Sequence, residues 1–336
     1  MLLDEDQPRL LVIRERDVGL FSMVLQVLNT LFLLEEQKID RIPVALFGRG
    51  ILYFQAVGYE GRSNVWEYYF EPLVPGIGEE CVLSALGPKS FELLGSKRKW
   101  LELERGSIEF PQDLHLLAPL DATDWANLAQ LDQLVLPRDW AWTESFHPTV
   151  DGRSLESFNI PRDSAADLIR RYVRPREHIR LKAAEIYDSY LKGHYVIGVH
   201  VRGTDGHGAP ARGVTIPFDR YFAEIEQKSR ELGDEACRVF LATDEQAIVS
   251  LFEDRLRDRL VYLDTVRKVD GDEVFGVGPT GQVMPGYIAA GGELAVKNGE
   301  AAVVEYTLLC KSQFLLHNVS SLSRAAAFCV PESVHL

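Results

Sequence analysis

The chain has 336 residues, 46% of them hydrophobic and 26% charged, which is typical of a folded globular protein and excludes extensive disorder. Its formal net charge of −14 repels polyanions, so we expect it to bind neither nucleic acid nor anionic membrane surfaces. The length suits two domains of roughly 150 residues each. An anionic substrate would therefore need a locally positive pocket within an acidic protein.

The N-terminal sequence MLLDEDQPRL lacks the basic start and apolar core of a signal peptide. No run approaches the roughly 20 apolar residues that a membrane span requires. We therefore expect a cytoplasmic protein without integral membrane association. The four cysteines are widely scattered and show no CxxC spacing, which favours buried thiols over a metal site or disulfide framework.

The first half of the chain begins with a β-rich run over residues 9–14. Apolar residues then recur at helical spacing over residues 21–34, and residues 42–47 are again strand-like. This order predicts a βαβ unit. Beyond an aromatic-dense segment at residues 64–73, we expect helices over residues 91–104 and 121–134.

The second half alternates between helices and strands. A helix broken at Pro175 is expected over residues 163–191, and the continuous apolar run 195–201 is typical of a strand buried on both faces. The elements expected after it are a helix 218–232, a strand 239–242, a helix 245–256, a strand 260–263, a helix 301–311, a strand 314–317 and a helix from 322. This alternation predicts a second parallel α/β sheet. We place the domain boundary near residue 190, giving domains 1–190 and 191–336.

The strongest candidate site is the sequence GVHVRGTD at residues 198–205, where the buried strand ends in polar residues and glycines. With the two-residue period of a strand, His200 and Arg202 share one face. Ligands of open α/β sheets bind at the carboxyl ends of strands, and the planar fork of Arg202 suits a diphosphate. The alternative is an Arg202–Asp205 ion pair at a strand end, with His200 as a satisfied polar group.

Two further segments have polar residues where an element begins or ends. Asp244 follows an expected strand, where it could serve a ligand or cap the next helix. Glu305 opens an expected helix, and serines begin another helix after the strand 314–317. Backbone amides and hydroxyls at a helix start can bind an anion, although ordinary capping also explains Ser321.

Four other interpretations are set aside. Residues 276–281 match GxGxxG, but Pro279 and Pro285 prevent the required helix, so we predict a loop. A nicotinamide-linked enzyme is disfavoured because no glycine fingerprint follows the first strand. His200, Asp205 and His207 are of metal-binding types but lack a fourth ligand, so no metal is expected. The glycosylation sequon at residues 318–320 lies in an apolar strand-like segment and is discounted.

GVHVRGTD, followed in order by LATDE, VVEYTLLCKSQFLLHNVSS and AAAF, resembles the α1,6-fucosyltransferases of the nodulation and core-fucosylation type and the related protein O-fucosyltransferases. The resemblance spans about Tyr195 to Phe328 and is thinner at residues 16–22 and 64–73. It implies a GT-B type α/β fold, in which two facing Rossmann-like domains have parallel sheets. The second domain would hold most of the GDP-fucose donor, the first would shape the acceptor site, and no cofactor would be needed.

The resemblance also implies roles for single residues. Arg202 would hold the donor β-phosphate and neutralise the departing GDP, with His200 beside it and Asp205 keeping the loop in place. Glu305 stands where the family has an aspartate needed for activity, and Asp244 matches its second acidic position. The remaining expected donor contacts are Ser320, Ser321 and Leu322, together with Gly19 and Phe21 from the first domain.

The chain also departs from the family pattern. Glu305 is one methylene longer than the usual aspartate, and Gly203 replaces a second basic residue. The glutamate proposed as base in some relatives has no counterpart in residues 206–215, which leaves His207, Glu15 or Asp17 as candidate bases. We expect inverting, metal-independent transfer to a hydroxyl of a glycan or other acceptor. The alternative is an inactive nucleotide-sugar-binding or scaffold protein.

Overall fold

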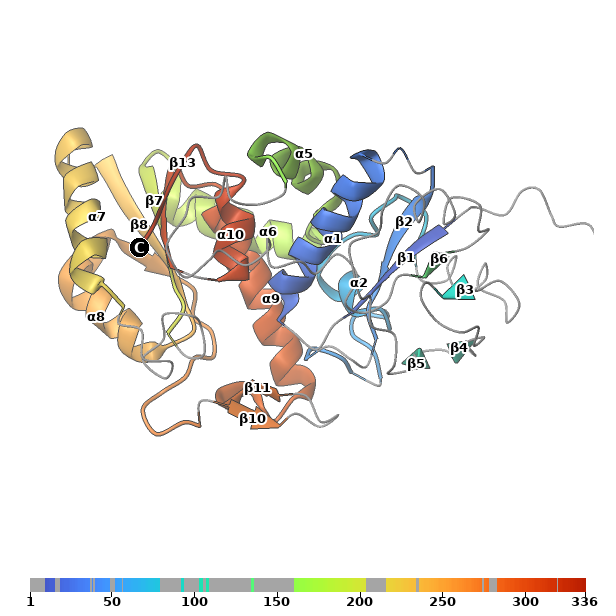
Figure 1. Ribbon diagram of the computed structural model, residues 1–336. Helices are drawn as coiled ribbons and strands as arrows, with labels where there is room; N and C mark the ends of the chain where they lie inside the picture. Colours follow the sequence, from blue (N-terminus) through green and yellow to red (C-terminus); the bar gives the residue numbers. More distant parts are fainter. Residues whose placement is uncertain are drawn as a thin grey trace, which may run out of the picture. The chain divides into compact units, whose positions relative to one another are not determined.

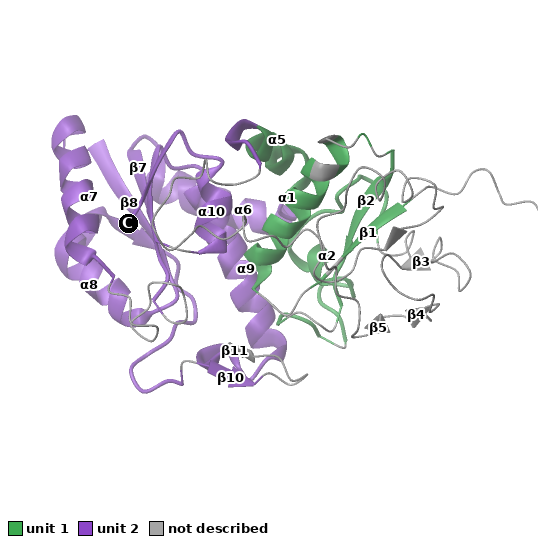
Figure 2. Cartoon of the chain, in the orientation of Figure 1, with its two compact units in different colours: residues 1–146, 164–174 green, residues 147–163, 175–336 purple. Residues whose placement is uncertain are grey.

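A computed structural model describes residues 10–15, 19–36, 38, 40–48, 52–55, 57–78, 160–203, 216–233, 236–273, 275–277, 283–318 and 320–336, and short strands at 92–93, 103–104, 107–108 and 134–135. The chain divides into two compact units, residues 1–146 with 164–174 and residues 147–163 with 175–336 (Figure 2). The domain boundary near residue 190 stays a prediction. In the described part of the chain, no helix has the length and apolarity needed to cross a bilayer.

The first unit contains the predicted βαβ unit. Strand β1 (Leu10–Arg14) pairs in parallel with β2 (Ile42–Leu46), and helix α1 (Leu20–Glu36) connects them. The sheet has the order β2-β1-β6-β3, with β6 at Leu134–Val135 and β3 at Glu92–Leu93. The prediction of β1, α1 and β2 from apolar periodicity is confirmed.

Asn64 ties the aromatic-dense segment to this sheet. Its Oδ1 accepts hydrogen bonds from the amides of Phe47 at 2.9 Å and Trp66 at 3.2 Å, while its Nδ2 donates to the Ala45 carbonyl at 2.9 Å. It therefore caps the short helix α2 (Val65–Tyr69), whose five residues are all buried. The segment is part of the core of the first unit.

The helices expected over residues 91–104 and 121–134 are wrong wherever the structure describes those ranges. β3 pairs in parallel with β6, and β4 (Leu103–Glu104) pairs antiparallel with β5 (Ser107–Ile108). Short apolar runs do not distinguish a helix from a strand, and here the pairing partner decides. The rest of both ranges lies outside the described residues.

The second unit is built on a five-stranded parallel sheet with the order β13-β12-β7-β8-β9. The apolar run 195–201 forms the central strand β7 (Tyr195–Val201). The other strands are β8 (Cys237–Thr243), β9 (Leu260–Tyr262), β12 (Phe314–His317) and β13 (Glu332–His335). The predicted parallel sheet is confirmed, and β13 is an additional strand.

Helices cover both faces of this sheet (Figure 1). Helices α7 (Phe218–Leu232) and α8 (Gln246–Leu256) lie on one face, and α9 (Gly292–Leu309) and α10 (Ser321–Ala327) lie on the other. Right-handed crossovers produce this separation, because the chain moves outward from β7 to β9 and then returns to β12 on the other side. Before β7, α5 (Arg162–Tyr172) and α6 (Glu177–Ile186) flank the predicted break at Pro175.

Two boundaries in the second unit differ from expectation. Helix α9 begins at Gly292 rather than near residue 301, since packing overrides the low helix propensity of its glycines. The loop expected at the GxGxxG pattern is wrong for Gly276 and Val277. They belong to β10 (Phe275–Val277), which forms an antiparallel hairpin with β11 (Val283–Pro285).

Gly198 allows α9 to end close to the central strand. A Cβ atom on Gly198 would lie 2.5 Å from Ser312 Oγ and 3.1 Å from Leu309 Cδ2. Ser312 is buried, and its hydroxyl has no hydrogen-bond partner among the described residues. The glycine is thus explained by packing.

We expect Gly198→Ala to destabilise the protein by about 1–3 kcal/mol, because the added methyl overpacks this contact. Ser312→Ala removes the nearest atom, so adding it to Gly198→Ala should recover part of the loss. Urea unfolding of the wild type, both single variants and the double variant measures this coupling. Strictly additive changes would contradict the packing explanation.

Candidate functional site

Three polar residues follow neighbouring strands at the carboxyl edge of the second sheet. His200 of β7 lies in register with Ala242 of β8 and His317 of β12. Arg202, Asp244 and Asn318, which come just after these strands, therefore gather at one edge. The strand order reverses between β7 and β12, and such switch points are where open α/β sheets bind ligands.

Asn318 joins the ends of β7 and β12 across this switch point. The Arg202 amide donates to Asn318 Oδ1 at 2.9 Å, and Asn318 Nδ2 donates to the Arg202 carbonyl at 3.1 Å. The side-chain amide thus satisfies both backbone groups of Arg202. The sequence had marked Asn318 only as part of a discounted sequon, although its place directly after a strand was a usable signal.

Asp244 holds the side chain of Arg202 and the backbone of Gly203. Its Oδ2 lies 3.2 Å from Arg202 Nε, and its Oδ1 accepts a hydrogen bond from the Gly203 amide at 2.8 Å. The suggestion that Asp244 caps the next helix is wrong, because Glu245 occupies the N-cap position of α8. The Arg202–Asp205 alternative involves a residue outside the described ranges.

Gly203 occupies the position at which the motif resemblance led us to expect a second basic residue. A Cβ atom here would lie 2.3 Å from Glu245 Oε2 and 2.7 Å from Ile248 Cδ1. The Glu245 carboxylate also lies 3.6 Å from Lys268 Nζ. A larger residue at position 203 would therefore require Glu245 to move, and Lys268 brings a cation near this point from another loop.

His200 is buried, and it shares a face of β7 with Gly198, which packs against the end of α9. Its Nδ1 has no hydrogen-bond partner within the described part of the chain. Burial lowers the pKa of His200 to about 4, a shift that nearby Asp244 opposes and Arg202 reinforces. The imidazole is therefore neutral at neutral pH and would contribute hydrogen bonding rather than charge.

Glu305 lies near the end of α9, so its interpretation as a first-turn acid is wrong. Its Oε1 is 3.9 Å from Arg267 Nη2 and has no hydrogen-bond partner among the described residues. Burial raises the pKa of Glu305 to about 8, with Arg267 opposing the shift and Asp244 adding to it. At this separation, burial outweighs the attraction of the arginine, and the carboxyl is mainly protonated at neutral pH.

The expected phosphate-binding serines lie around the start of α10. Ser320 occupies the N-cap position without a side-chain cap bond, and Ser321 is the first helical residue. Instead, Ser323 Oγ lies 3.1 Å from both the Asn318 and the Ser320 carbonyl oxygens, and its one hydroxyl proton is shared between these two acceptors. Leu322 is buried, so it would offer its backbone rather than its side chain.

The other predicted site residues belong to the first unit or lie outside the described ranges. Gly19 precedes α1, and its carbonyl accepts the Ser22 amide at 3.0 Å. Phe21 and Glu15 are buried within the first unit. The predictions for Asp205, His207 and Asp17 lie outside the described residues.

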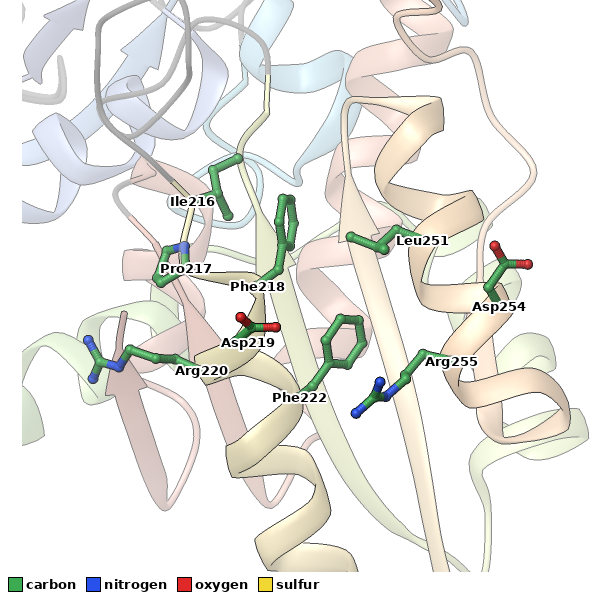
Figure 3. A pocket seen from close by; sticks show the side chains of 9 residues that line it. All are labelled: Ile216, Pro217, Phe218, Asp219, Arg220, Phe222, Leu251, Asp254 and Arg255. Atoms are coloured by element: carbon green, nitrogen blue, oxygen red, sulfur yellow. The ribbon is translucent and has the colours of Figure 1, made fainter.

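A separate pocket of about 710 Å³ lies between α7 and α8 (Figure 3). Phe218, Phe222 and Leu251 supply its apolar surface, and charged residues such as Asp254 and Arg255 stand around them. No predicted site residue that the structure describes lines it. It is therefore distinct from the Arg202 cluster.

The pKa of Glu305 gives a testable pH dependence of stability. Because the folded-state value of about 8 lies above the usual value of about 4.3, folding takes up a proton between these limits, and stability falls as pH rises. We expect the stability of the wild type relative to Glu305→Gln to fall by up to about 1.4 kcal/mol per pH unit between pH 5.5 and 8. Urea unfolding measures it, and the exposed Glu293→Gln on the same helix should show no such slope.

The chain is similar to known proteins in its fold but not in its sequence. No protein-family model matches the chain, and no curated protein matches it significantly in sequence. The NodZ α-1,6-fucosyltransferase co-crystallized with GDP aligns with a TM-score of 0.56 and 15% identity, covering 98% of this chain and 95% of that one. For POFUT1 in complex with GDP-fucose the TM-score is 0.54 at 11% identity, with 99% of each chain covered. For fucosyltransferase NodZ from Bradyrhizobium it is 0.53 at 16% identity, with 96% and 94% covered.

These similarities extend over both halves of the chain, including the first half, where the motif resemblance is thin. The fold that the motifs implied is thereby confirmed. The protein has the mixed α/β fold with parallel sheets seen in the GT-B fucosyltransferase structures.

Proposed function

We propose that the protein is a glycosyltransferase that transfers fucose from GDP-fucose to a hydroxyl of a glycan or other acceptor. The observation that carries this proposal is the position of Arg202, which Asn318 and Asp244 hold at the switch point of the second sheet. The structures with the same fold that contain GDP or GDP-fucose support the choice of donor.

Arg202 has the properties needed to stabilise a departing diphosphate. Its ion pair with Asp244 through Nε orients the planar guanidinium, while 31% of the side chain remains exposed to a ligand. Paired hydrogen bonds from a guanidinium to phosphate oxygens are strong and directional. Because the group is already oriented, little reorganisation is needed when charge develops on GDP.

The charges around Arg202 also favour an anion. Arg202 lies near the carboxyl group of Asp244, Arg267 near that of Glu305, and Lys268 near that of Glu245. Since Glu305 is mainly protonated at neutral pH, it does not offset the positive charge of Arg267. This is the locally positive region that an acidic protein needs to bind a nucleoside diphosphate.

We further propose that the transfer inverts the anomeric centre and needs no metal ion. Positioned reactants and the arginine would supply most of the rate enhancement. A base within hydrogen-bond reach of the acceptor hydroxyl typically adds 10²–10⁴-fold, and His207, Glu15 and Asp17 remain its candidates. Donor binding without product formation would instead favour an inactive nucleotide-sugar-binding protein.

We expect GDP at 100 times its dissociation constant to stabilise the wild type by about 2.7 kcal/mol. UDP, ADP and NAD at the same concentration should stabilise it less. Arg202→Ala should lose this stabilisation and fucosyl transfer while remaining folded, since the side chain is partly exposed. Arg202→Lys should recover little, because an ammonium lacks the fork. Thermal unfolding and a transfer assay measure both effects. Arg220→Ala, which removes an exposed arginine on α7, serves as the control, and wild-type turnover in Arg202→Ala would refute the assignment.

We expect transfer to persist in excess EDTA, because an arginine takes the role that a divalent ion has in metal-dependent transferases. The measurement is the initial rate of fucose transfer before and after chelation. Loss of activity that manganese specifically restores would contradict this prediction and would favour a metal site involving His200, Asp205 and His207.

A further inference from the structure

A segment that follows β9 pairs with the backbone around Asp244. The Lys268 amide donates to the Asp244 carbonyl, and the Gln246 amide donates to the Lys268 carbonyl, both at 2.9 Å. Glu245 and Lys268 also form an isolated parallel bridge. The segment therefore continues the pairing beyond the end of β8, at the residue that holds Arg202.

Arg267 secures this segment with a buried guanidinium. Its Nε donates to the Thr243 carbonyl at 3.1 Å, and Nη2 donates to the Leu263 carbonyl at 2.6 Å. Nη1 donates to the Thr265 carbonyl at 3.4 Å. The guanidinium therefore contacts both the end of β8 and the loop that follows β9. Thr243 directly precedes Asp244, so one side chain joins the loop after β9 to the end of β8.

The charge of Arg267 is held within the protein and not at its surface. Only 2% of its side chain is exposed, and it lies 3.9 Å from the Glu305 carboxyl. A buried cation is costly unless hydrogen bonds satisfy it, and here backbone carbonyls do so. Replacing Arg267 would leave the Thr243 and Leu263 carbonyls without this donor, next to Asp244.

We propose that Arg267 is a positioning residue of the donor site. By holding the end of β8, it keeps Asp244 aligned on the Arg202 side chain and the Gly203 amide. Its importance for donor binding rests on the proposed function, whereas its effect on Asp244 can be tested without a ligand. No local sequence pattern indicates this role, since Arg267 acts on a strand end distant in the chain.

The first test uses the Gly203 amide, which donates to Asp244 Oδ1. We expect Arg267→Met to speed hydrogen exchange of this amide at least about tenfold, because its acceptor loses its alignment. The Val196 amide is the internal reference. It donates to a side-chain acceptor at the other end of β7, Gln313 Oε1 at 2.7 Å, and should keep its exchange rate.

Arg41→Met is the matched control for loss of a buried arginine. As whole residues, backbone included, Arg41 and Arg267 are each 7% exposed, and Arg41 Nη1 donates to the Leu10 carbonyl in the first unit. The control should lower stability without changing exchange at Gly203. If Arg267→Met does not fold, Arg267→Lys carries the same test, with a smaller increase expected because the ammonium keeps the charge but loses the fork.

The second test is a double-mutant cycle for GDP affinity. If Arg267 acts through Asp244, Arg267→Met and Asp244→Ala should each weaken GDP binding about tenfold, and the double variant should be little weaker than either. Isothermal titration calorimetry measures the dissociation constants. A purely structural effect of Arg267 would instead add to that of Asp244→Ala.

The outcomes separate this inference from the proposed function. Unchanged Gly203 exchange in a folded Arg267 variant, or additive effects on GDP affinity, would overturn the positioning role. Faster exchange in a protein whose wild type binds no GDP would support the positioning role and refute the proposed donor. Faster exchange with non-additive loss of GDP binding would support both.

Discussion

The site depends on the two hydrogen bonds between the Asn318 side chain and the Arg202 backbone. Strands β7 and β12 end side by side at this point. A side-chain amide can donate and accept at once, so it continues the pairing for one more residue. The position of the Arg202 guanidinium, and its pairing with Asp244, presuppose this backbone connection.

The charged groups form a site that is stable before any ligand arrives. Each cation near the edge has a carboxyl or carbonyl neighbour, which limits the cost of taking charge out of water. Burial favours the protonated form of the Glu305 carboxyl, despite the nearby Arg267. A neutral Glu305 leaves the positive charge that a diphosphate would neutralise, so the same burial that costs stability at high pH favours an anionic ligand.

Two glycines bring the supporting helices close to the chain that carries the site. Gly198 admits the end of α9 on one face of β7, and Gly203 leaves room for Glu245 and for Ile248 of α8. A side chain at position 198 would crowd Ser312 and Leu309, and one at position 203 would crowd Glu245 and Ile248. A larger residue at position 203 would require the Glu245 and Ile248 side chains to move, and Lys268 is a nearby cation.

Apolar patterns alone determined the βαβ unit of the first half and the strands β7, β8 and β12, because buried parallel strands read as short continuous apolar runs. They also placed Arg202 and Asp244 at strand ends, and the motifs correctly implied the fold. Only the tertiary structure decided that Asn318 joins Arg202 and that Arg267 supports Asp244. Those contacts link residues distant in the chain, and which strand ends become neighbours follows from the strand order of the folded sheet.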